Sequence, residues 1–271
     1  MKQNRFFIGT SYSFYLYFAV YTNNQRAYFM VKLILPFLLF SIVASAQQNP
    51  ILFQQQSWAS FNLQTKFKNN WGTWFDAEIH TKENYFNQFS LATFRVAGTY
   101  YLKNKNKLAA GIGYTDFFPA EGHKYISVPE RFTWQQFQWY HNNEHHKLWQ
   151  WFRLEQRWKA KVVDDYTLAN SSTFYQKLRY NITYQIPLNK TGFGPKKPFL
   201  STSEELYLYY GATIPNHVLD QNRVFVGLGY ALNKHENLIC GVLNIFQENA
   251  QGTQYINNNV LRVTFFENIG F

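Results

Sequence analysis

The sequence predicts an all-β protein, an antiparallel transmembrane β-barrel, on three observations. Eleven stretches of roughly ten to fifteen residues alternate apolar and polar side chains between Trp58 and Phe266, and each ends in a turn. Aromatic residues make up 20% of the chain, and many stand where these stretches end, as in the aromatic girdles of membrane barrels. Beyond the N-terminal segment no run of about 18 apolar residues exists, which excludes spanning helices.

The N-terminal segment has the pattern of a secretory signal peptide at about residues 30–46. Met30–Lys32 is a short basic start, Leu33–Val43 is apolar, and Ala44–Ala46 matches a small-residue cleavage site. The apolar run is shorter than the roughly 20 residues that a spanning helix needs. We therefore expect cleavage near Ala46 rather than a membrane anchor.

Residues 1–29 precede this signal and are expected to be an upstream extension of the reading frame, which leaves the start codon open between Met1 and Met30. The expected organisation is an extension plus signal over residues 1–46 and one barrel domain over residues 47–271. Removing four bases and no acids lowers the formal net charge from +10 to +6. The remaining bases are scattered, so no nucleic-acid partner is expected.

The single cysteine, Cys240, excludes an intrachain disulfide and a thiolate-rich metal site. An exported chain of this size needs other stabilisation. A closed sheet in a membrane provides it, because every strand hydrogen bond is then made within the sheet.

The turn signals define the predicted strands in chain order. If the C-terminus is periplasmic, that side receives the shorter connections, 68–70, 103–107, 142–146, 188–198 and 233–237. The outer side receives 83–88, 118–130, 162–171, 212–221 and 249–256. Short turns inside and longer loops outside are typical of outer-membrane barrels, and 188–198 is the exception.

The strand count needs an adjustment under this interpretation, because bacterial single-chain barrels have even numbers of strands. A first strand over Trp58–Phe67 would run downward and requires an upward strand before it. We therefore predict twelve strands, with the additional one around Ile51–Gln56, and ten as the alternative.

Five short motifs stand along the chain: Gln56-Ser57-Trp58, Asn70-Trp71-Gly72-Thr73-Trp74-Phe75, Leu154-Glu155-Gln156-Arg157-Trp158, Lys177-Leu178-Arg179-Tyr180 and Tyr184-Gln185-Ile186-Pro187-Leu188. Together they resemble the DUF2490 family. The resemblance covers about residues 50–271 and implies an exported outer-membrane β-barrel of a Gram-negative, Bacteroidetes-like bacterium. It supplies no activity and no catalytic residues.

The alternation predicts which side chains line the lumen. In Leu178–Ile186 the even positions are apolar and the odd positions polar, so one face meets lipid and the other water. The lumen-lining candidates are Arg95, Arg153, Glu155, Arg157, Lys177, Arg179, Glu205, Arg223 and Arg262. Two interpretations stay open: a paired network that fills a narrow lumen, or a basic constriction that admits small anionic solutes. The expected function is correspondingly small-solute passage or a structural or lipid-handling role in the outer membrane.

Other motifs point to no chemistry. His141, Glu144, His145 and His146 include metal-ligating residue types but lie in a turn, where a solvated surface is expected, so neither a metal nor a cofactor is predicted. His80, Ser90, Ser171 and Ser172 do not show the spacing of a catalytic triad. We therefore expect no enzyme, with an outer-membrane lipid hydrolase as the alternative.

Location and partners follow from the barrel. The expected partners are outer-membrane lipid and the barrel-assembly machinery, which would recognise the terminal aromatic Phe271 after an alternating last strand. A soluble periplasmic barrel is the other alternative. Its inward face would be the apolar one, and it would bind an apolar ligand.

Overall fold

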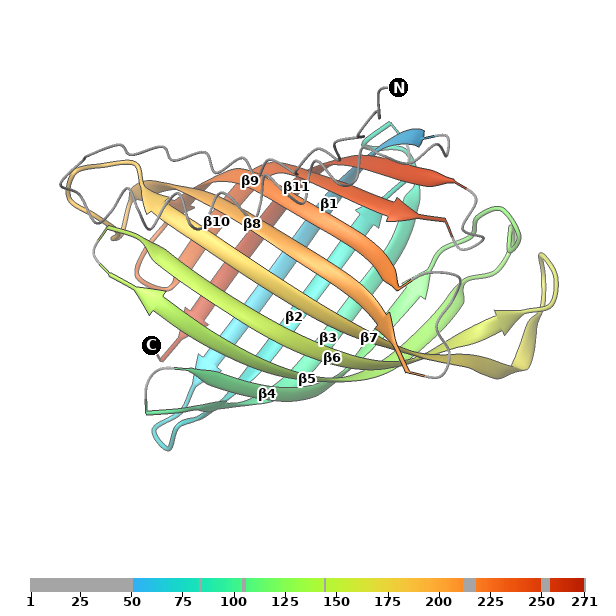
Figure 1. Ribbon diagram of the computed structural model, residues 1–271, viewed down its shortest axis with the longest axis horizontal. Helices are drawn as coiled ribbons and strands as arrows, with labels where there is room; N and C mark the ends of the chain where they lie inside the picture. The colour runs from blue at the N-terminus through green and yellow to red at the C-terminus, as the bar shows by residue number, and fades with distance from the viewer. Residues whose placement is uncertain are drawn as a thin grey trace, which may run out of the picture. The chain divides into compact units, whose positions relative to one another are not determined.

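The computed structural model describes residues 51–270 except 83, 104–105, 144, 212–217 and 250–253. The eleven predicted stretches each form one strand, and the labels in Figure 1 follow chain order. The strands are β1 (Ile51–Lys66), β2 (Trp71–Thr81), β3 (Phe89–Tyr101), β4 (Lys107–Phe117), β5 (Val128–Asn142), β6 (Lys147–Val162), β7 (Leu168–Pro187), β8 (Lys197–Tyr210), β9 (Leu219–Ala231), β10 (Glu236–Glu248) and β11 (Tyr255–Ile269).

The strands close into one barrel, and ten of the eleven neighbouring pairs are antiparallel hairpin partners. The closing pair is parallel: β1 aligns with β11 from Ile51↔Tyr255 to Thr65↔Ile269. An odd number of strands joined by hairpins makes the first and last strands run in the same direction, so their pairing has to be parallel. The barrel is therefore mixed, and not purely antiparallel as predicted.

The predicted twelfth strand, like the alternative of ten, is wrong for the described part of the chain. Ile51–Gln56, expected to form that additional strand, is the first part of β1, which is sixteen residues long. Its backbone pairs with Tyr255–Val260 of β11. The predicted signal peptide and both possible start codons lie outside the described residues.

The connections alternate between the two ends of the barrel as predicted. The chain passes from β1 to β2, β3 to β4, β5 to β6, β7 to β8 and β9 to β10 at the end where β11 finishes, and from each even-numbered strand to the next strand at the other end. Asparagines close two of the short turns. The Asn143 side chain accepts hydrogen bonds from the amides of His145 and His146, both at 2.8 Å, and Asn233 holds the turn before β10 in the same way.

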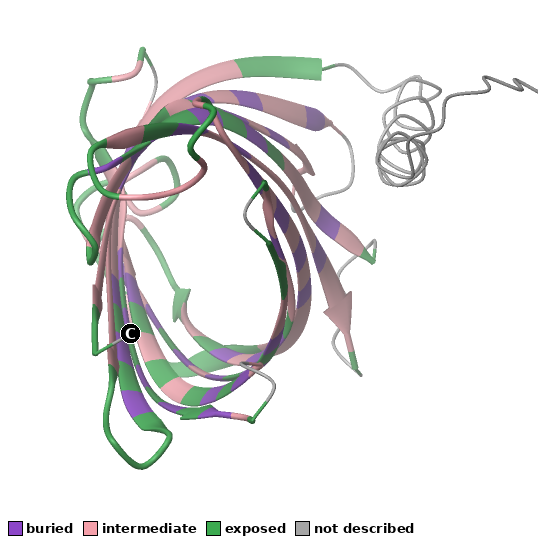
Figure 2. Cartoon of the chain, turned by 90° about the vertical axis from the view of Figure 1, so that its left-hand side faces the viewer, coloured by how far each residue is buried: buried purple, intermediate pink, exposed green. Residues whose placement is uncertain are grey.

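Polar side chains point into the barrel and apolar ones outward along several strands, and two clusters of apolar residues, around Trp58 and around Trp74, are also buried inside. Along β3, Thr93, Arg95 and Thr99 are buried, while the intervening Phe94 and Val96 are exposed. Figure 2 shows this alternation as buried and exposed bands along the strands. No helix in the described ranges is long and apolar enough to cross a bilayer.

Candidate functional site

The buried charges lie inside the barrel, as contacts between non-neighbouring strands demonstrate. The guanidinium of Arg153 on β6 lies 5.5 Å from the ring centre of Trp74 on β2. Lys107 on β4 donates a hydrogen bond to Gln64 on β1 at 2.6 Å. These strands are not paired with each other in the closed sheet, so the contacts cross the interior.

A continuous ion-pair network covers the interior of β5 to β8. We call Glu130, Arg157, Glu155, Arg179 and Glu205 the paired network. Arg157 donates to Glu155 at 2.5 Å and to Glu130 through two nitrogens. Arg179 donates to Glu155 and to Glu205, each at 2.8 Å. Each guanidinium thus bridges two carboxylates, which is the arrangement that compensates buried charge.

Other pairs extend this pattern. Arg95 on β3 bonds to Asp76 and, at 3.0 Å, to Glu78, both on β2. Lys177 on β7 donates to Asp220 on β9 at 2.6 Å. The lumen therefore contains more carboxylates than the predicted set, and most of its positive charge is locally balanced.

Aromatic rings support the cations that carboxylates neutralise only in part. The ion pair between Nη1 of Arg153 and Oε1 of Glu155 is long, at 3.9 Å. The Arg153 guanidinium lies 4.3 Å from the centre of the Trp134 ring and 5.0 Å from that of the Trp151 ring. The Lys107 ammonium lies 4.4 Å from the Trp74 ring. Such cation–π contacts stabilise desolvated positive charge.

Two arginines have no carboxylate partner within the described ranges. Arg223 on β9 accompanies Gln221, to which it donates a hydrogen bond at 2.8 Å, and the rings of Trp58 and Tyr207. The guanidinium of Arg262 on β11 lies 5.6 Å from the centre of the Phe225 ring. The Nε atom of Arg262 is buried without a hydrogen-bond partner. Both arginines converge on Trp58, which is the register neighbour of Arg262 and lies 4.9 Å from Arg223.

The structure thus places all nine predicted residues on the inward face and gathers five of them, Arg153, Glu155, Arg157, Arg179 and Glu205, into connected contacts. Sequence reasoning missed Glu130, Asp76, Glu78 and Asp220. Asp76 and Glu78 alternate with apolar neighbours in β2, so periodicity could have found them, whereas Glu130 stands between Pro129 and Arg131. Asp220 lies at a register shift between β8 and β9, which breaks the period.

Neither a metal site nor a catalytic triad was predicted, and the described residues considered for them lie in different parts of the barrel. No group of three or more His, Cys, Asp or Glu among the described residues is placed to hold a metal ion. His80 stacks on Trp58 inside the barrel at 3.7 Å between ring centres, whereas Ser171 and Ser172 are exposed on β7. Glu144 and Phe271 lie outside the described residues.

Comparison with known proteins gives one family. The family described as "Protein of unknown function (DUF2490)" matches residues 55–256, from β1 into β11. No curated protein and no solved structure matches the chain. A match over most of the barrel confirms the resemblance noted in the motifs, and the chain belongs to the DUF2490 family.

Proposed function

We propose that the protein is an integral outer-membrane β-barrel of a Gram-negative bacterium whose lumen accepts small anionic solutes. The proposal includes export by the predicted signal peptide and assembly through the C-terminal aromatic residue. The observation that carries it is the presence of two unpaired arginines, Arg223 and Arg262, inside a barrel whose outward face is apolar.

The outward face supports the membrane part of the proposal. Val224, Val226 and Leu228 on β9 follow one another at alternate positions with 40%, 51% and 61% of their surface exposed. Cys240 and Val242 continue this face on β10, and Leu261 and Val263 on β11. Contiguous exposed apolar surface of this extent is unfavourable in water and favourable in contact with acyl chains.

The inward face argues against a soluble barrel with an apolar cavity. That alternative requires an apolar interior. Apolar clusters around Trp58 and Trp74 do lie inside the barrel, but the paired network and the unpaired arginines occupy the same inward face. A carboxylic or phosphate-bearing ligand would satisfy Arg223 and Arg262, whereas an uncharged ligand would leave both without a counter-charge.

The two halves of the lumen have different roles in this proposal. The paired network connects β5 to β8 and fixes that part of the wall, because each of its arginines is held by two carboxylates. Arg223 and Arg262 project from β9 and β11, where positive charge is uncompensated. An entering anion therefore meets an attractive potential beside these two arginines.

The test has two steps on the purified full chain. Gel mobility with and without boiling in detergent first establishes whether a closed barrel resists unfolding. Reversal potentials in planar bilayers under a salt gradient then report the ion selectivity. The wild type is compared with the double variant Arg223→Gln/Arg262→Gln. Arg131→Gln, which removes an outward arginine, is the control. We expect anion selectivity that only the double variant reduces. A boiling-sensitive barrel without conductance, or with unchanged selectivity, would contradict solute passage.

A further inference from the structure

One arginine differs from all the others in its direction. Of the seven arginines that the structure describes, six point into the barrel, and Arg131 on β5 alone points outward and is exposed. None of the ion pairs among the described residues includes Arg131. Its inward neighbours, Glu130 and Phe132, are buried, so the strand alternation itself fixes Arg131 on the outer wall.

Aromatic residues flank Arg131 on both sides. Tyr114 of β4 and Trp158 of β6 are its register partners, so an outward row of Tyr, Arg and Trp crosses three strands. All three positions lie toward the barrel end where β2, β4 and β6 finish. Tyr, Trp and Arg together are the residue types that gather where a membrane meets water, with the charged group directed to the headgroups.

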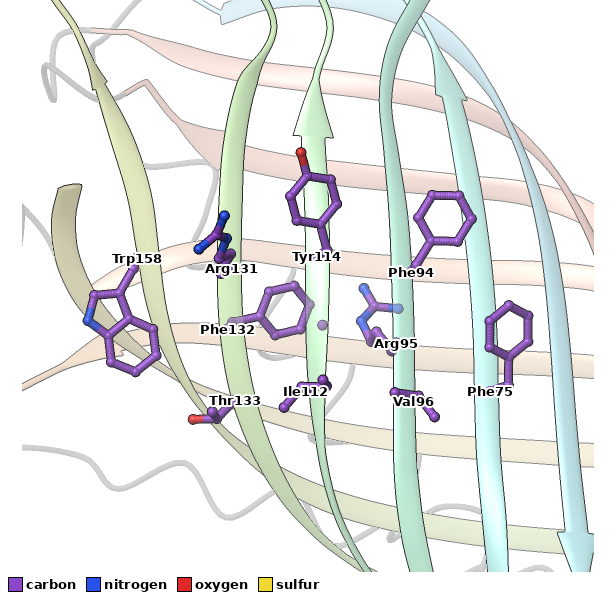
Figure 3. Close-up of a pocket in the computed structure, with 11 residues that line it drawn as sticks. Phe75, Phe94, Arg95, Val96, Ile112, Tyr114, Arg131, Phe132, Thr133 and Trp158 are labelled. Carbon is purple, nitrogen blue, oxygen red and sulfur yellow. The ribbon is translucent and has the colours of Figure 1, made fainter. Parts of the chain in front are cut away.

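The same row borders an apolar groove of about 460 Å³ on the outer wall. Figure 3 shows Phe75, Phe94, Val96 and Ile112 along one part of it, with Tyr114 and Arg131 side by side on neighbouring strands. Its floor is the β4 backbone at Gly113, and a Cβ there would collide with the Phe132 ring on the inner side. The glycine therefore allows Phe132 to pack directly behind the strand.

We infer that this groove binds one phosphate-bearing membrane lipid, with an acyl chain along Phe94, Val96 and Ile112 and the phosphate on Arg131. The inference rests on the membrane placement in the proposed function. The apolar walls match a hydrocarbon chain, and an exposed guanidinium that forms no ion pair with a described carboxylate matches a phosphate, which it can bind with two parallel hydrogen bonds. The Tyr114 hydroxyl stands next to Arg131 and supplies a further donor.

Native mass spectrometry of the detergent-solubilised full chain tests the inference. The protein is incubated with phosphatidylglycerol or with a diacylglycerol of identical acyl chains, which lacks the phosphate. Arg131→Gln is compared with Lys161→Gln, which removes the same charge from an exposed position on β6 toward the same end of the barrel. We expect the wild type and Lys161→Gln to retain one phosphatidylglycerol, and Arg131→Gln to bind it about tenfold more weakly.

Two results would overturn the lipid site. The first is equal retention of phosphatidylglycerol by Arg131→Gln, and the second is equal retention of diacylglycerol by the wild type. Gel mobility with and without boiling is recorded for every variant, so that loss of lipid is not confused with loss of the barrel. A boiling-sensitive barrel from the membrane fraction that binds no lipid refutes the groove alone. A wild-type protein found in the soluble fraction without a mobility shift refutes the membrane placement and the groove with it.

Discussion

Glu155 of β6 accepts a hydrogen bond from Arg179 of β7 at 2.8 Å, and Glu155 is completely buried. The second carboxylate oxygen accepts from Arg157 at 2.5 Å. One carboxylate thus neutralises guanidinium groups on two strands and holds the centre of the paired network.

Replacing this carboxylate is expected to destabilise the barrel strongly. Glu155→Gln keeps the shape but leaves Arg157 and Arg179 with one carboxylate each, so the free energy of unfolding should fall by about 3–5 kcal/mol. Denaturant unfolding in detergent measures it. Glu121→Gln, the same change in an exposed loop, is the control and should stay within about 0.5 kcal/mol. Equal stability of the two variants would show that the network contributes little.

Replacing Lys107, another buried charge, should not lower the free energy of unfolding. It is 1% exposed and bonds to Gln64, but it has no carboxylate partner among the described residues. Lys107→Met removes a buried, uncompensated charge and keeps the length of the side chain against Trp74. We expect unchanged or higher stability, because apolar replacement of buried charge is often neutral or stabilising. The same unfolding assay checks this, and a loss comparable to that of Glu155→Gln would contradict it.

An arginine introduced on the outward face tests whether that face contacts lipid. Val226→Arg on the exposed face of β9 should lower folding stability in lipid vesicles by about 2–4 kcal/mol if that face contacts the bilayer core. Val163→Arg makes the same substitution at an exposed valine in the 163–167 connection and should have little effect. If both variants fold equally well in vesicles, the β9 face does not meet lipid.

The parallel closure can be tested with engineered cysteines in a Cys240→Ser background. Ser57 and Leu261 are register partners on the outward faces of β1 and β11, and neighbouring strands lie about 4.8 Å apart. Ser57→Cys/Leu261→Cys should form a disulfide on oxidation, seen as a reducible change in gel mobility. Ala59→Cys/Thr264→Cys, whose side chains point to opposite faces, is the control. Absence of cross-linking in the first pair would indicate another strand between β1 and β11.

The strand count shows where sequence reasoning went wrong. Alternation located all eleven strands, because period-two burial is a property of each strand alone. The additional strand was inferred from the even numbers common in bacterial barrels, not from a pattern in Ile51–Gln56. No turn signal separates that segment from the rest of β1, and its inclusion in β1 was decided by pairing with Tyr255–Val260.

The candidate site was predictable only in part for a related reason. Arg153, Glu155 and Arg157 occupy alternate positions of one strand, so the sequence places them on one face. Whether each is paired depends on partners from other strands: Glu130 for Arg157 from β5, and Arg179 for Glu155 from β7. Arg223 and Arg262 have the same periodic signal as Arg179, and nothing in their local sequence shows that they lack a carboxylate.

By itself the sequence determined the all-β class, the strand positions and the inward placement of the nine predicted charged side chains, because a strand's two-residue period requires no knowledge of its neighbours. The tertiary structure decided the number of strands, the parallel β1–β11 closure and the division of the lumen into a paired network and unpaired arginines. These depend on register between strands, and closure joins residues from opposite ends of the described chain, so no local pattern encodes them.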